Sequence, residues 1–195
     1  AYQFCEWNLS DIRFNKINPN HLREKYEKYS SRYKIKEYQP FADDGESILA
    51  AGEEAPFFKV KSINRKEVIN FSQLRGKTIL LDFFSRFCAP CIESIPHLNE
   101  LNEKYGEYGF IVIGINAGKN EVDKDYWKKY IKINKINYPV IHKGDEIAEL
   151  FKVSGVPAFF LVDKTGKIVY SDGGFGKGSE KLIDKVIENA LGNKM

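Results

Sequence analysis

Two cysteines separated by two residues, Cys88 and Cys91, are the residues of this sequence best suited to chemistry. A thiol attacks a disulfide as the thiolate, and a free cysteine with a pKa of about 8.5 is mostly protonated at neutral pH. The N-terminus of a helix stabilises a thiolate, because its free N–H groups and dipole face the sulfur. An apolar run at 78–84 precedes the pair and a helical pattern follows it. We therefore expect Cys88 to be the nucleophile and Cys91 the resolving thiol of a disulfide exchange reaction.

A zinc site is the structural alternative for such a pair of cysteines. Zinc normally takes four ligands, and a structural site usually shows a second closely spaced pair. The remaining cysteine and the histidines show no paired spacing; they are Cys5, His21, His97 and His142. We therefore predict no metal. Cys5 is expected to be an incidental thiol, with a regulatory or intermolecular disulfide as the alternative.

An acidic residue lies inside the apolar run, six residues before the first cysteine. This residue is Asp82. Burying a carboxylate is costly unless it has a partner or a function. Two interpretations stay open at this point: an acid with a function beside the cysteine pair, or a structural acid in an ion pair.

Strand and helix patterns alternate from about Gly52 to the C-terminus. Short apolar runs predict buried strands, and apolar residues at three- and four-residue spacing predict helices. Ser179 is expected to cap the last helix, and the glycine-rich segment 173–178 is expected to be a loop without a phosphate site. The strands are predicted at 78–84, 110–115, 139–141, 158–162 and 168–170, and the helices from the cysteine motif to about 105, at 123–133, at 145–151 and from 179 onward. This order predicts an α/β sandwich around a mixed sheet.

The segment 81–91, Leu-Asp-Phe-Phe-Ser-Arg-Phe-Cys-Ala-Pro-Cys, resembles the active site of the thioredoxin superfamily. Segments 52–58 and 71–77 resemble the entry strands of its TlpA/ResA branch, and 95–98 resembles the sequence that follows the motif there. The resemblance covers about residues 52–191. It implies a thioredoxin-like three-layer sandwich and a thiol–disulfide oxidoreductase of the cell envelope, where some members serve cytochrome c maturation. It implies no bound cofactor, and electron exchange with a partner dithiol protein.

The resemblance also implies roles for individual residues. Cys88 and Cys91 would be catalytic, and Asp82 would match the buried acid that moves a proton to or from the resolving thiol. Val156 and Pro157 match the position of a cis proline, where the exposed backbone would dock an extended substrate. The other expected substrate-binding residues flank or separate the cysteines; they are Phe87, Ala89 and Pro90.

Two positions depart from the pattern of the branch. Phe87 replaces the usual tryptophan before the nucleophile. The glutamate often found three residues after the second cysteine is replaced by Ser94, and Glu93 is one place earlier. A shift of one residue turns a helical side chain by about 100°, so we expect Asp82 rather than Glu93 to handle the proton.

Residues 1–51 differ in composition from residues 52–195, and the sequence predicts two parts. The first is expected to be a partly helical N-terminal extension, with a helix over 21–38. Tyr26, Tyr29 and Tyr33 recur along one side of that helix and are expected to pack onto the core. A turn at 43–46 would mark the junction with the thioredoxin-like domain.

Composition excludes some classes of function. The net charge of +3 is too small to indicate nucleic-acid binding, and no apolar run approaches the ~20 residues of a membrane span. The expected partners are protein substrates with thiols or disulfides. A soluble domain in the cell envelope or periplasm, with an anchor on a segment outside this chain, is implied by the resemblance alone. The alternatives are a peroxiredoxin-like antioxidant enzyme, which Ser85-Arg86-Phe87-Cys88 matches loosely, and a binding module of the same fold.

Overall fold

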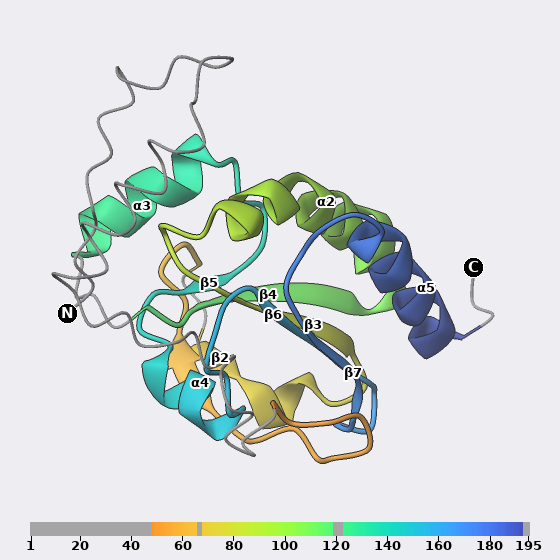
Figure 1. Cartoon of the computed structure of the whole chain (residues 1–195). Helices are drawn as coiled ribbons and strands as arrows, with labels where there is room; N and C mark the ends of the chain where they lie inside the picture. The colour runs from red at the N-terminus through yellow and green to blue at the C-terminus, as the bar shows by residue number, and fades with distance from the viewer. Residues whose placement is uncertain (1–47, 66–67, 119–122, 193–195) are drawn as a thin grey trace, which may run out of the picture. The chain divides into compact units, whose positions relative to one another are not determined.

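The computed structural model describes residues 48–65, 68–118 and 123–192. These residues form an α/β sandwich around a five-stranded mixed sheet (Figure 1). The expected α/β three-layer fold is therefore confirmed. The predicted N-terminal helix, its tyrosine stripe and the turn at 43–46 lie outside the described residues.

The central strand of the sheet is β3 (Thr78–Phe84), and the strand order is β5-β4-β3-β6-β7. β3 pairs in parallel with β4 and antiparallel with β6, so the C-terminal ends of β3, β4 and β5 lie at the same edge. The other sheet strands are β4 (Phe110–Asn116), β5 (Val140–Ile141), β6 (Ala158–Val162) and β7 (Ile168–Gly173). A separate antiparallel pair is formed by β1 (Lys59–Lys61) and β2 (Val68–Asn70).

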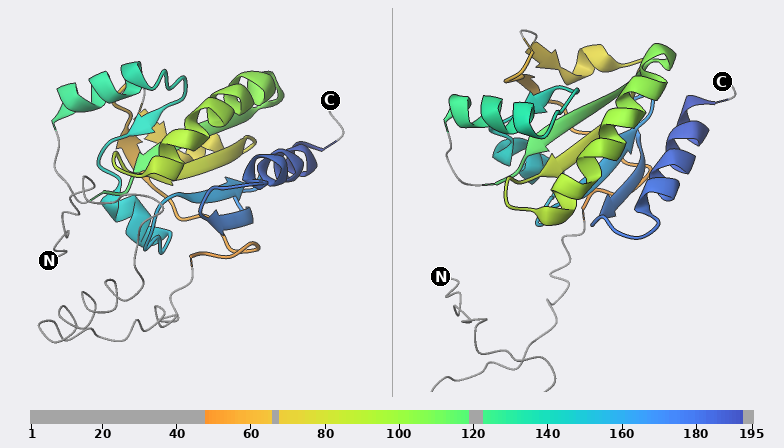
Figure 2. Two further views of the ribbon diagram at one scale, coloured as in Figure 1. Left: turned by 45° about the horizontal axis from the view of Figure 1, so that its top comes forward. Right: turned by 90° about the horizontal axis from the view of Figure 1, so that it is seen from above.

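Helices cover both faces of the sheet (Figure 2). α2 (Ala89–Tyr105), α3 (Lys124–Ile133) and α5 (Ser179–Leu191) pack with Leu80, Phe84, Val112 and Phe159; we call this the helical face. α4 (Asp145–Leu150) and the β1/β2 pair pack with Leu81, Phe83, Ile113 and Phe160; we call this the aromatic face. β3 and β4 are covered on both faces of the sheet, which explains their continuous apolar sequences.

The compact unit includes residues before the predicted boundary at residue 52. Leu49 is buried in the aromatic face, and its backbone N–H donates to the carbonyl of Phe151 at 3.3 Å. The described part of the core therefore extends to Ile48, which also packs on this face.

Several local predictions were wrong. Segment 71–74 is a 3-10 helix, η2 (Phe71–Leu74), and not a strand; a second 3-10 turn, η3 (Gly106–Tyr108), follows α2. Gly178, and not Ser179, is the N-cap of α5; its φ is 95°, a value that other residues avoid, and no side chain caps this helix. Ser179 instead accepts a hydrogen bond from the Gly176 N–H. β7 continues three residues beyond its predicted end, to Gly173.

Candidate active site

The two cysteines lie where the central strand passes into a helix. β3 ends at Phe84, and α2 begins at Ala89 with Cys88 as its N-cap. The Cys91 N–H donates to the Cys88 Sγ at 3.2 Å, so the sulfur receives one of the free N–H groups of the first turn. Pro90 fits this turn because its missing N–H would have no helical partner. The predicted placement of the motif is therefore confirmed.

Cys88 and Cys91 form a disulfide, with their Cα atoms 5.2 Å apart. Cys88 is partly exposed, whereas Cys91 is 1% exposed and belongs to the core of the helical face. An outside molecule can therefore reach the first sulfur but not the second. This difference matches the expected order, in which one thiol meets the substrate and the other resolves the intermediate.

Asp82 lies in the middle of β3 and is 1% exposed. It is in register with Gly114 of β4 and Phe159 of β6, and Leu80 and Phe84 two residues away belong to the helical face. Since side chains alternate along a strand, its carboxyl group lies on the same face as Cys91. The acid and Cys91 therefore lie on one face of the sheet.

Burial raises the pKa of the Asp82 carboxyl from 3.8 to about 7, and a hydrogen bond from Tyr138 partly opposes this shift. The Oδ1 atom is buried without a hydrogen-bond partner. No salt bridge of this residue is present among the described residues, so the structural ion-pair alternative has no support there. A carboxyl that titrates near neutral pH can both accept and release a proton.

The substitution at position 94 has a structural consequence that the sequence did not predict. Ser94 is fully buried under the motif, and its hydroxyl donates to the Cys91 carbonyl at 2.9 Å. Glu93 is exposed, as its shift around the helix axis predicts. Asp82 is therefore the one acidic residue among the buried polar residues of the described chain.

The Val156–Pro157 peptide is cis, as the resemblance predicts. Pro157 is buried, its carbonyl accepts from the Gly174 N–H at 2.7 Å, and Val156 is partly buried against both faces of the sheet. Phe87 is 75% exposed beside Cys88 and Ile92 is 40% exposed one turn along. These exposed apolar side chains flank the accessible sulfur and suit an extended apolar substrate segment.

The Arg86 guanidinium lies 4.2 Å from the ring centroid of Phe87 and 5.3 Å from that of Tyr126. Its Nε atom is buried without a hydrogen-bond partner. The cation–π contacts hold the loop before the motif against α3. They also hold a positive charge in the loop two residues before Cys88, and a nearby cation favours the thiolate form of a cysteine.

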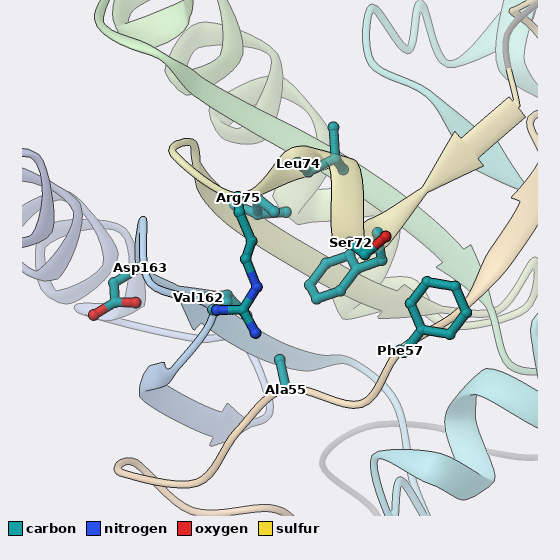
Figure 3. A pocket seen from close by; sticks show the side chains of 10 residues that line it. Ala55, Phe57, Ser72, Leu74, Arg75, Val162 and Asp163 are labelled. Atoms are coloured by element: carbon teal, nitrogen blue, oxygen red, sulfur yellow. The ribbon is translucent and has the colours of Figure 1, made fainter.

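A small cavity lies at the N-terminal end of β3, away from the cysteines, and is not part of this site (Figure 3). Its volume is about 60 Å³, and Ile79 and Val162 form part of its wall. Arg75 reaches across it, donates to the Thr165 carbonyl and contacts Glu54 at 3.6 Å. A cavity that small, closed by a locally paired arginine, is a packing feature. Within the described ranges, no cluster of three potential metal-ligating side chains is present.

Comparison with known proteins places this geometry among thiol–disulfide oxidoreductases. Residues 51–171 match the family model described as the AhpC/TSA family. The chain is 37% identical over 133 residues to the thiol–disulfide oxidoreductase ResA of Bacillus cereus, an alignment that covers 68% of this chain and 74% of that protein. It is 29% identical over 150 residues to ResA of Halalkalibacterium halodurans, which covers 76% of this chain and 80% of the relative.

A solved structure agrees with these sequence relatives. A putative thiol:disulfide interchange protein DsbE from Chlorobium tepidum superposes with a TM-score of 0.66 at 28% identity. The superposition covers 75% of this chain and all of that one. The residues matched by the family model, 51–171, include β3 and α2, which position the two cysteines.

Proposed function

Because this chain belongs to the AhpC/TSA family and, within it, to the ResA thiol–disulfide oxidoreductases, we propose that it works as a reductase of protein disulfides through Cys88 and Cys91. The observation that supports this most is the disulfide at the start of α2, with one accessible and one buried sulfur. The proposed catalytic group is completed by Asp82. Substrate would lie along Val156 and Pro157 and over Phe87, Ala89 and Pro90.

The proposed reaction moves two electrons from the dithiol to the substrate. The Cys88 thiolate attacks one sulfur of a substrate disulfide, and the other substrate sulfur leaves as a thiolate and takes a proton from water. Cys91 then gives its proton to the Asp82 carboxylate and attacks the Cys88 Sγ. The mixed disulfide breaks, the second substrate sulfur leaves as a thiolate, and the Cys88–Cys91 disulfide forms. A partner dithiol protein would reduce it for the next cycle.

Turnover of a protein disulfide substrate tests this proposal. Insulin reduction, driven by a chemical dithiol, should be lost in Cys88→Ser, because the attacking sulfur is removed. Cys5→Ser is the matched control and should keep full activity. Full activity of Cys88→Ser would refute the proposed site.

The direction of exchange is tested by the reduction potential. Dithiol proteins of this kind span about −270 mV for reductants to about −120 mV for strong oxidants. We expect a reduction potential nearer that of the reductants, measured by equilibration of the Cys88–Cys91 pair with a glutathione or dithiothreitol buffer. A reduction potential near that of the strong oxidants would make the protein an oxidant.

The cell envelope is the proposed location, and it rests on the TlpA/ResA branch that the motif resembles. No described helix has the length and apolarity needed to cross a bilayer. Accessibility of Cys88 to a thiol reagent that does not cross membranes, applied to intact cells, tests the location. Labelling only after lysis would contradict it.

The peroxiredoxin alternative predicts a different substrate for the same sulfur. Peroxide consumption by the reduced protein separates the two functions. We expect protein disulfides to oxidise Cys88 far faster than hydrogen peroxide does.

A further inference from the structure

The buried acid of the proposed reaction has a tyrosine neighbour whose position is determined by a glycine. Asp82 is in register with Gly114, and Gly114 is in register with Val140, so the three positions lie side by side on the helical face. A Cβ atom on Gly114 would lie 3.1 Å from Cε2 of Tyr138 and 3.2 Å from Cε1 of Phe84. The Tyr138 ring therefore occupies the space next to Asp82 that a side chain at position 114 would fill.

The backbone of Tyr138 is held from both sides. Asn64 donates to the Tyr138 carbonyl at 2.8 Å and accepts from the Val140 N–H at 2.9 Å. On the other side, the Asn137 N–H donates to Asn99 of α2 at 2.9 Å. The helix that holds the cysteines thus also fixes the loop that holds this tyrosine. With its backbone fixed and its ring packed, the tyrosine is 1% exposed and has little freedom to move.

The hydroxyl of Tyr138 interacts with the acid and lowers the pKa of the Asp82 carboxyl. Its hydrogen bond with the Asp82 carboxyl stabilises the ionised form, and the pKa of Tyr138 itself is raised well above its ordinary value, chiefly by burial. The second tyrosine on this side is Tyr130 of α3, whose buried hydroxyl has no hydrogen-bond partner. Burial, with a contribution from the Asp82 charge, raises the pKa of Tyr130 to about 12, so it stays neutral.

The remaining groups around Asp82 have little charge. α2 contributes Cys91 and Ser94 to this face, and the paired positions on β4 and β6 are Gly114 and Phe159. Among the described residues, no lysine, arginine or histidine shifts the pKa of Asp82. The Tyr138 hydroxyl is therefore the polar contact that opposes the effect of burial.

We propose that Tyr138, seated over Gly114, is a positioning residue that orients the Asp82 carboxyl and sets the pH at which it takes the Cys91 proton. This inference rests on the proposed function, because it assigns the tyrosine to the resolving step. In that step the Cys91 thiol loses its proton to the carboxylate as the S–S bond to Cys88 forms. The Tyr138 hydroxyl keeps its own proton and donates a hydrogen bond throughout.

Tyr138→Phe is the direct test, since it removes one oxygen and keeps the ring that fills the site. Loss of the hydrogen bond destabilises the carboxylate, so the titration midpoint of Asp82 should rise by about one pH unit. The carbon-13 chemical shift of the Asp82 carboxyl, assigned by comparison with Asp82→Asn, reports that midpoint. The pH midpoint of mixed-disulfide resolution, followed by stopped-flow, should rise with it.

Tyr130→Phe is the matched control, because it removes a buried hydroxyl from the same face that makes no hydrogen bond to Asp82. Its midpoint should stay within about 0.2 pH units of the unmodified protein. An unchanged midpoint in Tyr138→Phe, or an equal shift in Tyr130→Phe, would overturn the proposal.

Gly114→Ala tests whether the space at Gly114 positions the Tyr138 ring, and it leaves Asp82 and Tyr138 themselves unchanged. The added methyl group must displace the Tyr138 ring by a few tenths of an ångström, so the Asp82 midpoint should again rise. An unchanged Asp82 midpoint in a folded Gly114→Ala variant would contradict the role assigned to Gly114 in positioning the Tyr138 ring. The carboxyl titration needs no turnover, so it stays informative even if Cys88→Ser shows that the proposed function is wrong.

Discussion

The two faces of the sheet are built from neighbouring residues of β3 and differ sharply in chemistry. On the aromatic face, Leu81 and Phe83 are buried among apolar side chains, and Phe83 lies 5.4 Å from both Phe151 and Phe160 between ring centroids. On the helical face, Asp82 has one oxygen without a partner and lies in the same layer as a disulfide. The aromatic face therefore stabilises the fold, whereas the helical face loses stability by burying a carboxyl oxygen without a partner beside the disulfide.

Truncation on the aromatic face should give the largest effect. Phe83→Ala removes a fully buried ring and leaves a cavity, so the free energy of unfolding should fall by about 3–5 kcal/mol. Urea denaturation measures this loss. The pH dependence of disulfide exchange in the folded variant should stay as it was. A shifted pH profile would contradict this separation of the two faces, because it would couple the aromatic face to Asp82 and the disulfide.

On the helical face, a substitution is expected to raise the free energy of unfolding. The folded-state pKa of Asp82 lies above its unfolded value, so the native protein binds the proton more tightly and loses stability as the pH rises from about 4 to about 7. Asp82→Asn removes this penalty and should raise the free energy of unfolding at pH 8 by about 3 kcal/mol. Denaturation at pH 5 and pH 8 measures it, and the gain should be clearly smaller at pH 5. Resolution of the mixed disulfide should slow in the same variant.

A loss of stability on Asp82→Asn at pH 8 would show instead that the carboxylate is a stabilising structural acid. Leu81→Asn is a matched contrast, because it places the same amide one residue away on the aromatic face. That variant should be destabilised.

The smallest effect is expected from exposed phenylalanines at opposite ends of the sheet. Phe87 and Phe57 are 75% and 59% exposed, and Phe57 lines the small cavity far from the cysteines. Either Phe→Ala change should alter the unfolding free energy by no more than about 0.5 kcal/mol. Phe87→Ala should slow reduction of an unfolded protein about fivefold, the equivalent of about 1 kcal/mol of contact energy. Phe57→Ala should not, and equal slowing would remove Phe87 from the proposed substrate surface.

Much of the reactive face could be predicted from local sequence. The apolar run of β3, the cysteine spacing and the helical pattern after it predict a thiol at a helix N-terminus, and a lone acid in an apolar strand is conspicuous. These signals work because each depends on a few consecutive residues. The cis peptide before Pro157 was predicted by resemblance, since no local pattern requires it.

The partners of the acid could not be predicted in this way. Gly114 and Tyr138 are distant from Asp82 in sequence and meet it only through the register of three parallel strands. Ser94 was identified as a departure from the family, but its buried hydrogen bond to the Cys91 carbonyl depends on the packing of α2. The cap of α5 was placed one residue late, because a serine at a helix start is a common cap and the positive φ of Gly178 is not visible in the sequence.

Covalent trapping of a substrate shows which cysteine attacks it. In a Cys5→Ser background, Cys91→Ser should accumulate a mixed disulfide with a disulfide-bonded protein, because the partly exposed Cys88 still attacks and no resolving thiol remains. Cys88→Ser, which keeps only the buried sulfur, should trap none. Non-reducing mass spectrometry with peptide mapping identifies the linked cysteine. Trapping through Cys91, or no trapping by either variant, would contradict the assignment of Cys88 as the nucleophile of a thiol–disulfide reductase.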